Sequence, residues 1–102
     1  MPKDHSWWVY MLRCADGTLY TGMAADVDRR AKVHSAGKGA RYTRSRLPVE
    51  VVYREELESR SAALRREAEI KALSRGEKLK LIAQAAPGGK LTAGRFRTSM
   101  FQ

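Results

Sequence analysis

The sequence predicts an α/β (α+β) fold, in which helices flank a small three-stranded, mainly antiparallel sheet. Residues 7–23 hold two short aromatic and β-branched runs on either side of a strong turn signal, which is typical of a β-hairpin. Residues 49–53 form an apolar, β-branched run that indicates a third strand. Two segments with apolar residues at helical spacing follow it. The predicted order is therefore β-hairpin, helix, strand and two helices.

The length of the chain suits one domain. Its 102 residues can bury a single small core, and a hydrophobic fraction of 43% is ordinary for a globular protein. We expect residues 1–6 to be a loose lead-in, residues 7–85 to form the domain, and residues 86–102 to be a basic tail.

The charge balance indicates a polyanionic partner. Twenty Lys and Arg residues against eleven Asp and Glu give a net charge of +9 and a pI near 10.2. Such a field attracts nucleic acid first and an acidic membrane surface second. The basic residues recur along the whole chain, which favours a basic surface on a folded domain. General solubility charge is the alternative explanation.

Cysteine usage and hydropathy point to the cytoplasm. The single cysteine, Cys14, excludes an intrachain disulfide and a cysteine-based zinc site. No run approaches the ~20 apolar residues of a membrane span, and no signal-peptide pattern is present. We therefore expect a cytoplasmic protein without a membrane partner.

The length of the hairpin loop decides which side chains share a face of the sheet. A two-residue loop would place Tyr10 and Tyr20 on opposite faces. A three-residue loop over residues 15–17, with Gly17 in the left-handed conformation, would place both tyrosines on one face together with Gly22. A joint role for the two tyrosines therefore predicts the three-residue loop or a bulge, and a tight two-residue turn would count against it.

The helix after the hairpin is predicted over residues 27–36. Asp26 has the chemistry of an N-cap, and Gly37 marks the end of the helix. Arg30 and His34 lie four residues apart and so project from the same face. Spacing alone favours a solvated arginine and a surface histidine.

Residues 35–46 are predicted to form a loop that contacts phosphates. The segment offers positive charge, glycines that expose backbone amides, and an aromatic ring able to stack on a base. A mobile basic loop without a ligand is the alternative. The candidate nucleic-acid-binding residues are Lys38, Arg41, Tyr42, Arg44 and Arg46.

In the second half, residues 55–58 form an acidic stretch that is expected to lead away from the third strand. A helix is predicted over residues 61–73, and Glu67 falls within its apolar stripe. A carboxylate on a buried face is costly unless it is paired or binds a cation, which makes Glu67 a candidate metal ligand. An ion pair with Lys71, four residues later, is the alternative. The predicted stripe consists of Ala63, Leu64, Ile70 and Leu73.

The last helix is predicted to begin at a capping box, with Ser74 as N-cap and Glu77 three residues later. It should end near residue 85 and direct Leu79, Ile82 and Ala83 inward.

Taken together, these residues resemble a GIY-YIG nuclease domain, most closely its small single-domain bacterial (YhbQ-like) branch. The resemblance covers residues 7–82. The triplet WVY at 8–10 stands where the family has GIY, and YTG at 20–22 stands where it has YIG. Arg30 matches the phosphate-binding arginine of the family, and Glu67 matches its metal-binding glutamate. His34 stands at a position where the family usually has histidine or tyrosine. Two departures are Trp8 in place of the first glycine and Met23 where some relatives carry lysine.

The resemblance implies a metal-dependent endonuclease that hydrolyses phosphodiester bonds in nucleic acid, structure-selective DNA being favoured over RNA, in DNA repair or recombination. One Mg²⁺ or Mn²⁺ ion would be held by Glu67. A tyrosine with a pKa of about 10 is a poor base at neutral pH. Tyr20 is favoured nearest the attacking water, with Tyr10 and His34 positioning it, although the residues leave the identity of the base open. The implied catalytic residues are Tyr10, Tyr20, Arg30, His34 and Glu67, with Gly22 as a structural residue of the motif.

The leading alternative function is a non-catalytic module that binds DNA or RNA on the same fold, and a ribosome-associated or protein-interaction role is the third. A domain of this size has little surface for reading a base sequence. We therefore expect preference for a substrate structure, or a protein partner that supplies specificity, and a monomer or weak dimer.

Overall fold

The computed structural model describes residues 6–85 and 90–91. The predicted lead-in, apart from Ser6, and the predicted tail, apart from residues 90–91, lie outside the described residues. Within them, no helix is both long enough and apolar enough to cross a membrane. In chain order the elements are β1 (Trp7–Arg13), β2 (Leu19–Ala24), α1 (Val27–Ser35), α2 (Arg41–Arg44), β3 (Glu50–Leu57), α3 (Arg60–Lys71), α4 (Arg75–Gln84) and β4 (Lys90–Leu91).

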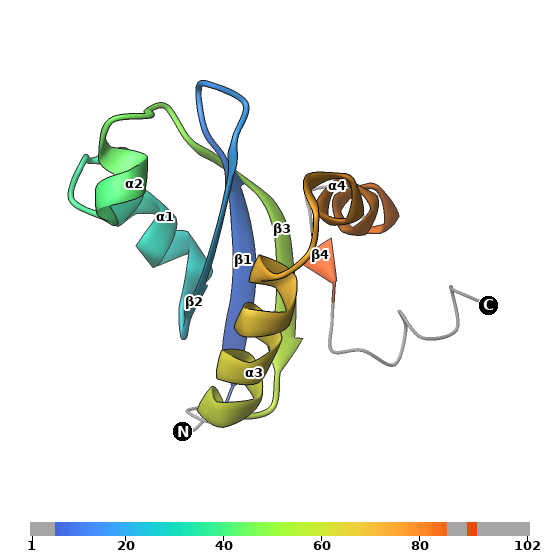
Figure 1. Cartoon of the computed structure of the whole chain (residues 1–102). Helices are drawn as coiled ribbons and strands as arrows, with labels where there is room; N and C mark the ends of the chain where they lie inside the picture. The colour runs from blue at the N-terminus through green and yellow to red at the C-terminus, as the bar shows by residue number, and fades with distance from the viewer. Residues whose placement is uncertain (1–5, 86–89, 92–102) are drawn as a thin grey trace.

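The sheet has the strand order β2-β1-β3-β4 (Figure 1). Strand β1 pairs antiparallel with β2 on one side and with β3 on the other, which confirms the predicted three-stranded antiparallel sheet. The two-residue strand β4 pairs with β3 in parallel and was not predicted. Because β1 is central, β2 forms one edge of the sheet.

The hairpin has the predicted three-residue loop. The amide of Cys14 donates to the carbonyl of Thr18 at 2.9 Å, and Gly17 adopts the left-handed conformation with φ 86°. Tyr10 consequently pairs with Gly22, and Leu12 pairs with Tyr20. Side chains at even positions of both strands therefore share one face, which confirms that Tyr10 and Tyr20 lie on the same side of the sheet.

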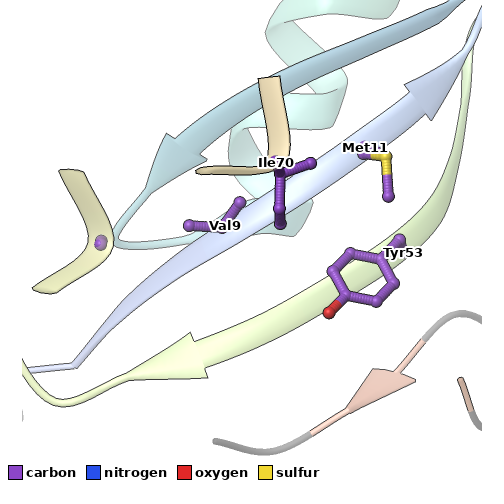
Figure 2. Packing of buried hydrophobic residues seen from close by; sticks show 5 residues of the cluster. Val9, Met11, Tyr53 and Ile70 are labelled. Atoms are coloured by element: carbon purple, nitrogen blue, oxygen red, sulfur yellow. The ribbon is translucent and has the colours of Figure 1, made fainter. Parts of the chain in front are cut away.

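The two faces of the sheet carry different helices. Val9 and Met11 of β1 and Tyr53 of β3 are buried against Ala63 and Ile70 of α3 (Figure 2). On the opposite face, Tyr10 and Leu12 are buried together with Val27 of α1. In Figure 1, α1 and α2 accordingly lie on one side of β2, and α3 and α4 lie on the other.

The predicted inward faces of the last two helices are partly wrong. Leu64 and Leu79 are exposed, and so is Ala83. In α3 the sheet contacts Ala63 and Ile70, seven residues apart, which turns Leu64 toward solvent. In α4 the apolar residues that pack against the core are Leu81, Ile82 and Ala85. The predicted capping box of α4, with Ser74 and Glu77, is confirmed.

Strand β3 is longer than predicted, because an acidic residue is buried within it. Glu55, 1% exposed, accepts a hydrogen bond from the Tyr53 hydroxyl at 2.6 Å and one from Arg66 Nε at 3.0 Å. The expectation that residues 55–58 lead away from the strand is therefore wrong for residues 55–57, which lie within β3. Burial and the adjacent Glu55 charge raise the pKa of Tyr53. A buried carboxylate held by an arginine and a phenol is stable where an unpaired one would not be.

Candidate active site

A buried tyrosine–histidine pair lies between β1 and α1. The Tyr10 hydroxyl and His34 Nε2 are 3.1 Å apart, and the two side chains are 1% and 0% exposed. Helix α1 brings His34 there because Asp26 caps its first turn by accepting from the amide of Arg29 at 3.0 Å. The surface position that spacing alone favours for His34 is therefore not the one it occupies.

The direction of the hydrogen bonds follows from the donors available. The Thr43 hydroxyl, in α2, donates its one proton to the carbonyl of Ala40 at 2.9 Å. Its oxygen then accepts from His34 Nδ1, which lies 2.8 Å away. With the imidazole proton on Nδ1, a neutral His34 accepts the Tyr10 proton at Nε2. The chain of donation therefore runs from Tyr10 through His34 and Thr43 to the backbone of Ala40.

Two glycines make room for this pair. A Cβ atom added to Gly22 would lie 2.6 Å from the Tyr10 hydroxyl oxygen, and one added to Gly39 would collide with the His34 imidazole. The space that Gly22 leaves at the sheet is therefore filled by Tyr10 itself. Gly39, together with Thr43, was missed by the sequence analysis; the two glycines at 37 and 39 were the available signal, whereas nothing in the sequence distinguishes Thr43.

Aromatic rings extend the site from the buried pair to the surface. The Tyr20 ring lies 5.3 Å from His34 and 6.5 Å from Tyr10, centroid to centroid. Tyr20 also stacks with the half-exposed Tyr42 at 6.1 Å and 24°. The Arg46 guanidinium lies 3.9 Å from the Tyr42 centroid. Tyr20 is thus the tyrosine of the two that reaches solvent, since Tyr10 is sealed beneath it.

Burial changes the acidity of the pair. It raises the pKa of Tyr10 to about 12, and the neighbouring Tyr20 phenol adds to this effect while Arg30 opposes it. Burial also lowers the pKa of His34, and the positive charge of Arg30 lowers it further. At neutral pH both groups are therefore uncharged, as the hydrogen-bond directions require.

Arg30 and Glu67 approach Tyr10 from different helices. The exposed Arg30 of α1 lies close enough to lower the pKa of the Tyr10 hydroxyl, and the negative charge of Glu67 in α3 raises it. Glu67 has an 18% exposed side chain and forms an ion pair with Lys71 at 3.2 Å. The ion pair with Lys71, given above as the alternative explanation for Glu67, is therefore present, and the Glu67 carboxylate is also half-buried. The other four predicted catalytic residues, Tyr20, Arg30, His34 and Glu67, therefore all act on Tyr10 of β1.

Among the five predicted catalytic residues, Glu67 supplies the one carboxylate that could bind a divalent ion. Within the described residues, no group of three or more His, Cys, Asp or Glu side chains is placed to hold a metal. Mg²⁺ is commonly bound by one or two carboxylates, with water and substrate phosphate completing its shell. The hard oxygen donors of Glu67 fit such an ion, with the remaining ligands supplied by solvent and substrate.

A groove of about 260 Å³ borders the aromatic cluster. Of the five predicted catalytic residues, Tyr20 lines it, and Tyr10, Arg30, His34 and Glu67 do not. The lining residues come from both sides of β2: Leu19, Tyr20, Thr21, Tyr42, Lys71 and Lys78. Lys71 and Lys78 were not among the predicted binding residues.

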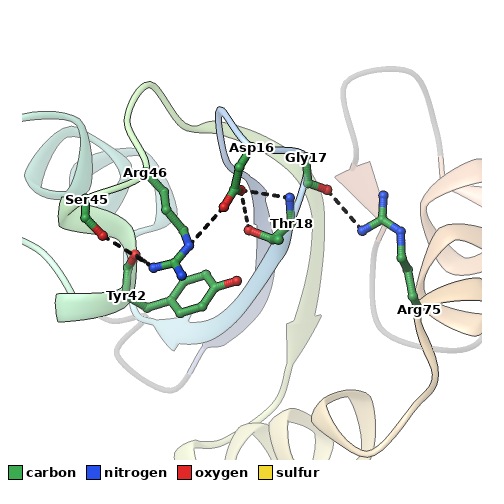
Figure 3. Close-up of polar contacts among 7 residues, drawn as sticks. All are labelled: Asp16, Gly17, Thr18, Tyr42, Ser45, Arg46 and Arg75. Atoms are coloured by element: carbon green, nitrogen blue, oxygen red, sulfur yellow. Dashed lines mark hydrogen bonds and ion pairs between the residues drawn. The ribbon is translucent and has the colours of Figure 1, made fainter.

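The predicted basic loop holds a short helix, α2, and its residues differ in how free they are. Lys38, Arg41 and Arg44 are exposed. Arg46, in contrast, donates to Asp16 of the hairpin loop and to the carbonyl of Tyr42, at 3.0 and 2.9 Å (Figure 3). Arg46 therefore fixes the basic segment against the hairpin.

A model of a known family matches most of the chain. The GIY-YIG catalytic domain aligns with residues 6–80. A UPF0213 protein from Natronomonas pharaonis is 55% identical over 83 residues, which are 81% of this chain and 95% of that protein. A UPF0213 protein from Staphylococcus saprophyticus is 49% identical over 77 residues, 76% of this chain and 94% of that protein.

Two solved structures are similar in fold. The solution NMR structure of a UPF0213 protein from Bacillus halodurans superposes with a TM-score of 0.52 at 41% identity, covering 92% of this chain and 93% of that one. The solution NMR structure of a protein from E. faecalis gives a TM-score of 0.53 at 38% identity, covering 78% and 85%.

Proposed function

The chain belongs to the GIY-YIG family, and from this premise we propose that it is a metal-dependent endonuclease that hydrolyses phosphodiester bonds in nucleic acid. The observation that carries the proposal is that a guanidinium, a carboxylate, a second phenol and a neutral histidine all act on the Tyr10 hydroxyl. Phosphodiester hydrolysis needs an oriented water, neutralised phosphate charge and a stabilised leaving oxygen. These groups can meet each need.

Arg30 and Glu67 would handle the charge of the substrate. The planar guanidinium of Arg30 can hold two oxygens of one phosphate. Glu67 would hold one Mg²⁺ or Mn²⁺ ion, which when bound supplies neutralising charge at the phosphate and the leaving oxygen. Without the ion, the half-buried Glu67 carboxylate is paired with Lys71. With the ion bound, the ion would take the place of Lys71, so the carboxylate would have a positively charged partner in both states.

The two tyrosines would have separate roles. Tyr20 reaches the groove and can touch the attacking water. Tyr10 donates its proton to His34 Nε2, and its pKa of about 12 keeps the hydroxyl protonated at neutral pH. A protonated phenol cannot accept the proton of the attacking water, so Tyr10 is a poor general base. Tyr10 and His34 are therefore positioning residues that fix the Tyr20 ring and the Arg30 guanidinium.

The test is a cleavage assay on branched, flapped and single-stranded DNA and on RNA, with Mg²⁺, Mn²⁺ or EDTA. We expect metal-dependent products, with structured DNA cut fastest. Glu67→Gln should reduce cleavage by at least about 100-fold, in the range for loss of electrostatic stabilisation at a reacting group. Glu69→Gln, on the same helix and exposed, is the matched control. Equal cutting by Glu67→Gln and wild type would refute the assignment.

A non-catalytic nucleic-acid-binding module is the second candidate, and the complete burial of Tyr10 and His34 favours it. This function predicts strongly salt-dependent binding with no metal-dependent product. Under either function we propose a cytoplasmic monomer or weak dimer that favours DNA over RNA, takes its specificity from substrate structure or from a protein partner, and for the nuclease serves DNA repair or recombination.

A further inference from the structure

The groove beside Tyr20 runs over the open edge of the sheet. Tyr20 and Tyr42 line it from the α1 and α2 side, and Lys71 and Lys78 line it from the α3 and α4 side. Lys71 also lies 3.2 Å from Glu67, so the groove begins next to the candidate metal ligand. A strand of nucleic acid held at Arg30 and Glu67 would therefore pass directly into the groove.

The floor of the groove offers hydrogen-bonding groups that have no partner among the residues the structure describes. The bond between the amide of Cys14 and the carbonyl of Thr18 sets the ladder, so hydrogen-bonded pairs recur at every second position of the hairpin. The backbone N–H and C=O groups of Leu19 and Thr21 then point away from β1, over the edge. In addition, the buried Thr21 hydroxyl, in a residue 4% exposed, has no partner within the described part of the chain. A buried hydroxyl without a partner is costly, and a ligand oxygen would satisfy it.

Two lysine side chains, Lys71 and Lys78, also line the groove. The charge of Lys71 is shared with Glu67, whereas Lys78 forms no ion pair with any described residue. Lys78 is also partly buried, so its position is more restricted than that of the exposed Lys80 on the same helix. An ammonium group that lines the same groove as outward-facing backbone amides is suited to a phosphate.

The two walls are tied to the same hairpin loop. On one side, Arg46 donates hydrogen bonds to Asp16 of the loop and to the carbonyl of Tyr42. On the other side, Arg75 of α4 donates to the carbonyl of Gly17 at 3.0 Å (Figure 3). Asp16 is itself fixed by bonds from the amide and hydroxyl of Thr18. The loop therefore sets the separation of Tyr42 from Lys78, so the groove exists before any ligand binds.

We propose that this groove is a second phosphate subsite, which takes the backbone phosphate of the nucleotide next to the cleaved bond. Lys78 and the β2 edge hold the phosphate, Thr21 donates to a phosphate or sugar oxygen, and the stacked rings of Tyr20 and Tyr42 contact the sugar and base. The subsite rests on the proposed function for its position relative to the cleaved bond. Its contact with nucleic acid does not depend on catalysis.

The experiment measures binding of a fluorescein-labelled, flapped DNA duplex by anisotropy in EDTA, at several KCl concentrations. Lys78→Gln should weaken binding about eightfold at 0.1 M salt and reduce the slope of log K against log [salt] by about 0.9, the value for one phosphate contact. Lys80→Gln removes the same charge from the same helix and should change both quantities much less. Thr21→Val should weaken binding about threefold while raising the melting temperature, because it removes an unpaired buried hydroxyl.

Equal effects of Lys78→Gln and Lys80→Gln would overturn the subsite and leave only general charge attraction. Unchanged affinity in Thr21→Val would show that the Thr21 hydroxyl does not contact the nucleic acid in the subsite. Cleavage that survives Glu67→Gln overturns the proposed assignment of the nuclease site but leaves the subsite as a binding surface. Absence of salt-dependent binding by the wild-type protein overturns both.

Discussion

The Tyr10 hydroxyl donates to Nε2 of His34 across 3.1 Å, although the two residues are 24 positions apart and both are buried. The bond joins the central strand to the end of α1. It leaves neither group free to exchange protons with solvent, so under the proposed function Tyr20 is the tyrosine that can reach the attacking water.

Tyr10→Phe should destabilise the protein while Tyr20→Phe should not. The first change leaves His34 Nε2 buried without a donor, which costs about 1–3 kcal/mol. The second removes a hydroxyl from a half-exposed ring, which should cost no more than about 0.5 kcal/mol. Urea unfolding measures both values. If the proposed roles hold, Tyr20→Phe abolishes cleavage at wild-type stability; the opposite pattern would exchange the two tyrosines.

The stability of the protein should fall as the pH drops below about 6.5, the ordinary pKa of histidine. The pKa of His34 is lowered in the folded state, so the unfolded chain binds more protons and acid favours unfolding. The stabilisation is present above pH 6.5 and is lost as the pH falls through the folded pKa. An NMR titration in a His5→Gln background, where His34 is the remaining histidine, should show it titrating below 6.5. A value at or above 6.5 would contradict the burial argument.

Gly22→Ala should disturb the site by steric conflict. The new Cβ would meet the Tyr10 hydroxyl oxygen at 2.6 Å, and displacing a buried ring costs about 1–3 kcal/mol. Gly76→Ala is the matched control, since its nearest neighbour lies at 4.0 Å within a helix, where alanine stabilises by about 0.5–1 kcal/mol. Thermal unfolding should therefore shift in opposite directions for the two variants. A neutral Gly22→Ala would show that Tyr10 has room to move.

Glu55→Gln should be among the most destabilising single changes, at about 3 kcal/mol. It leaves the Arg66 guanidinium and the Tyr53 hydroxyl facing an amide in a buried setting. Glu58→Gln, exposed and just beyond the same strand, serves as the control and should change stability by less than about 0.5 kcal/mol. Equal effects, measured by urea unfolding, would mean that the buried pair contributes no net stabilisation.

Local rules predicted the fold where one residue decides the geometry. Gly17 located the turn of the hairpin, whereas the choice of the three-residue loop depended on a joint role for the two tyrosines. Asp26 located the start of α1, and Ser74 with Glu77 located that of α4. The faces of α3 and α4 were harder to predict, because few apolar residues mark them and the sheet, rather than the helix sequence, selects which ones pack.

The polar part of the site could be predicted only in part. Arg30 and His34 were identified through the resemblance to the GIY-YIG family, and Glu67 through that resemblance and its place in an apolar stripe. The burial of His34 depends on Thr43 and Gly39, which a separate helix and loop bring to it. The buried position of Glu55 depends on Arg66, eleven residues later and on another element. Contacts of this kind have no local sequence pattern, so they emerge only when the elements pack.

The division of the site by β2 also sets when it can form during synthesis. The first half of the chain supplies Tyr10, Tyr20, Arg30 and His34, whereas Glu67 follows β3, the strand that completes the sheet around β1. A nascent chain on the ribosome therefore lacks this carboxylate until α3 has emerged and docked on β1, β2 and β3. Under the proposed function, a half-made protein can hold nucleic acid but cannot cut it.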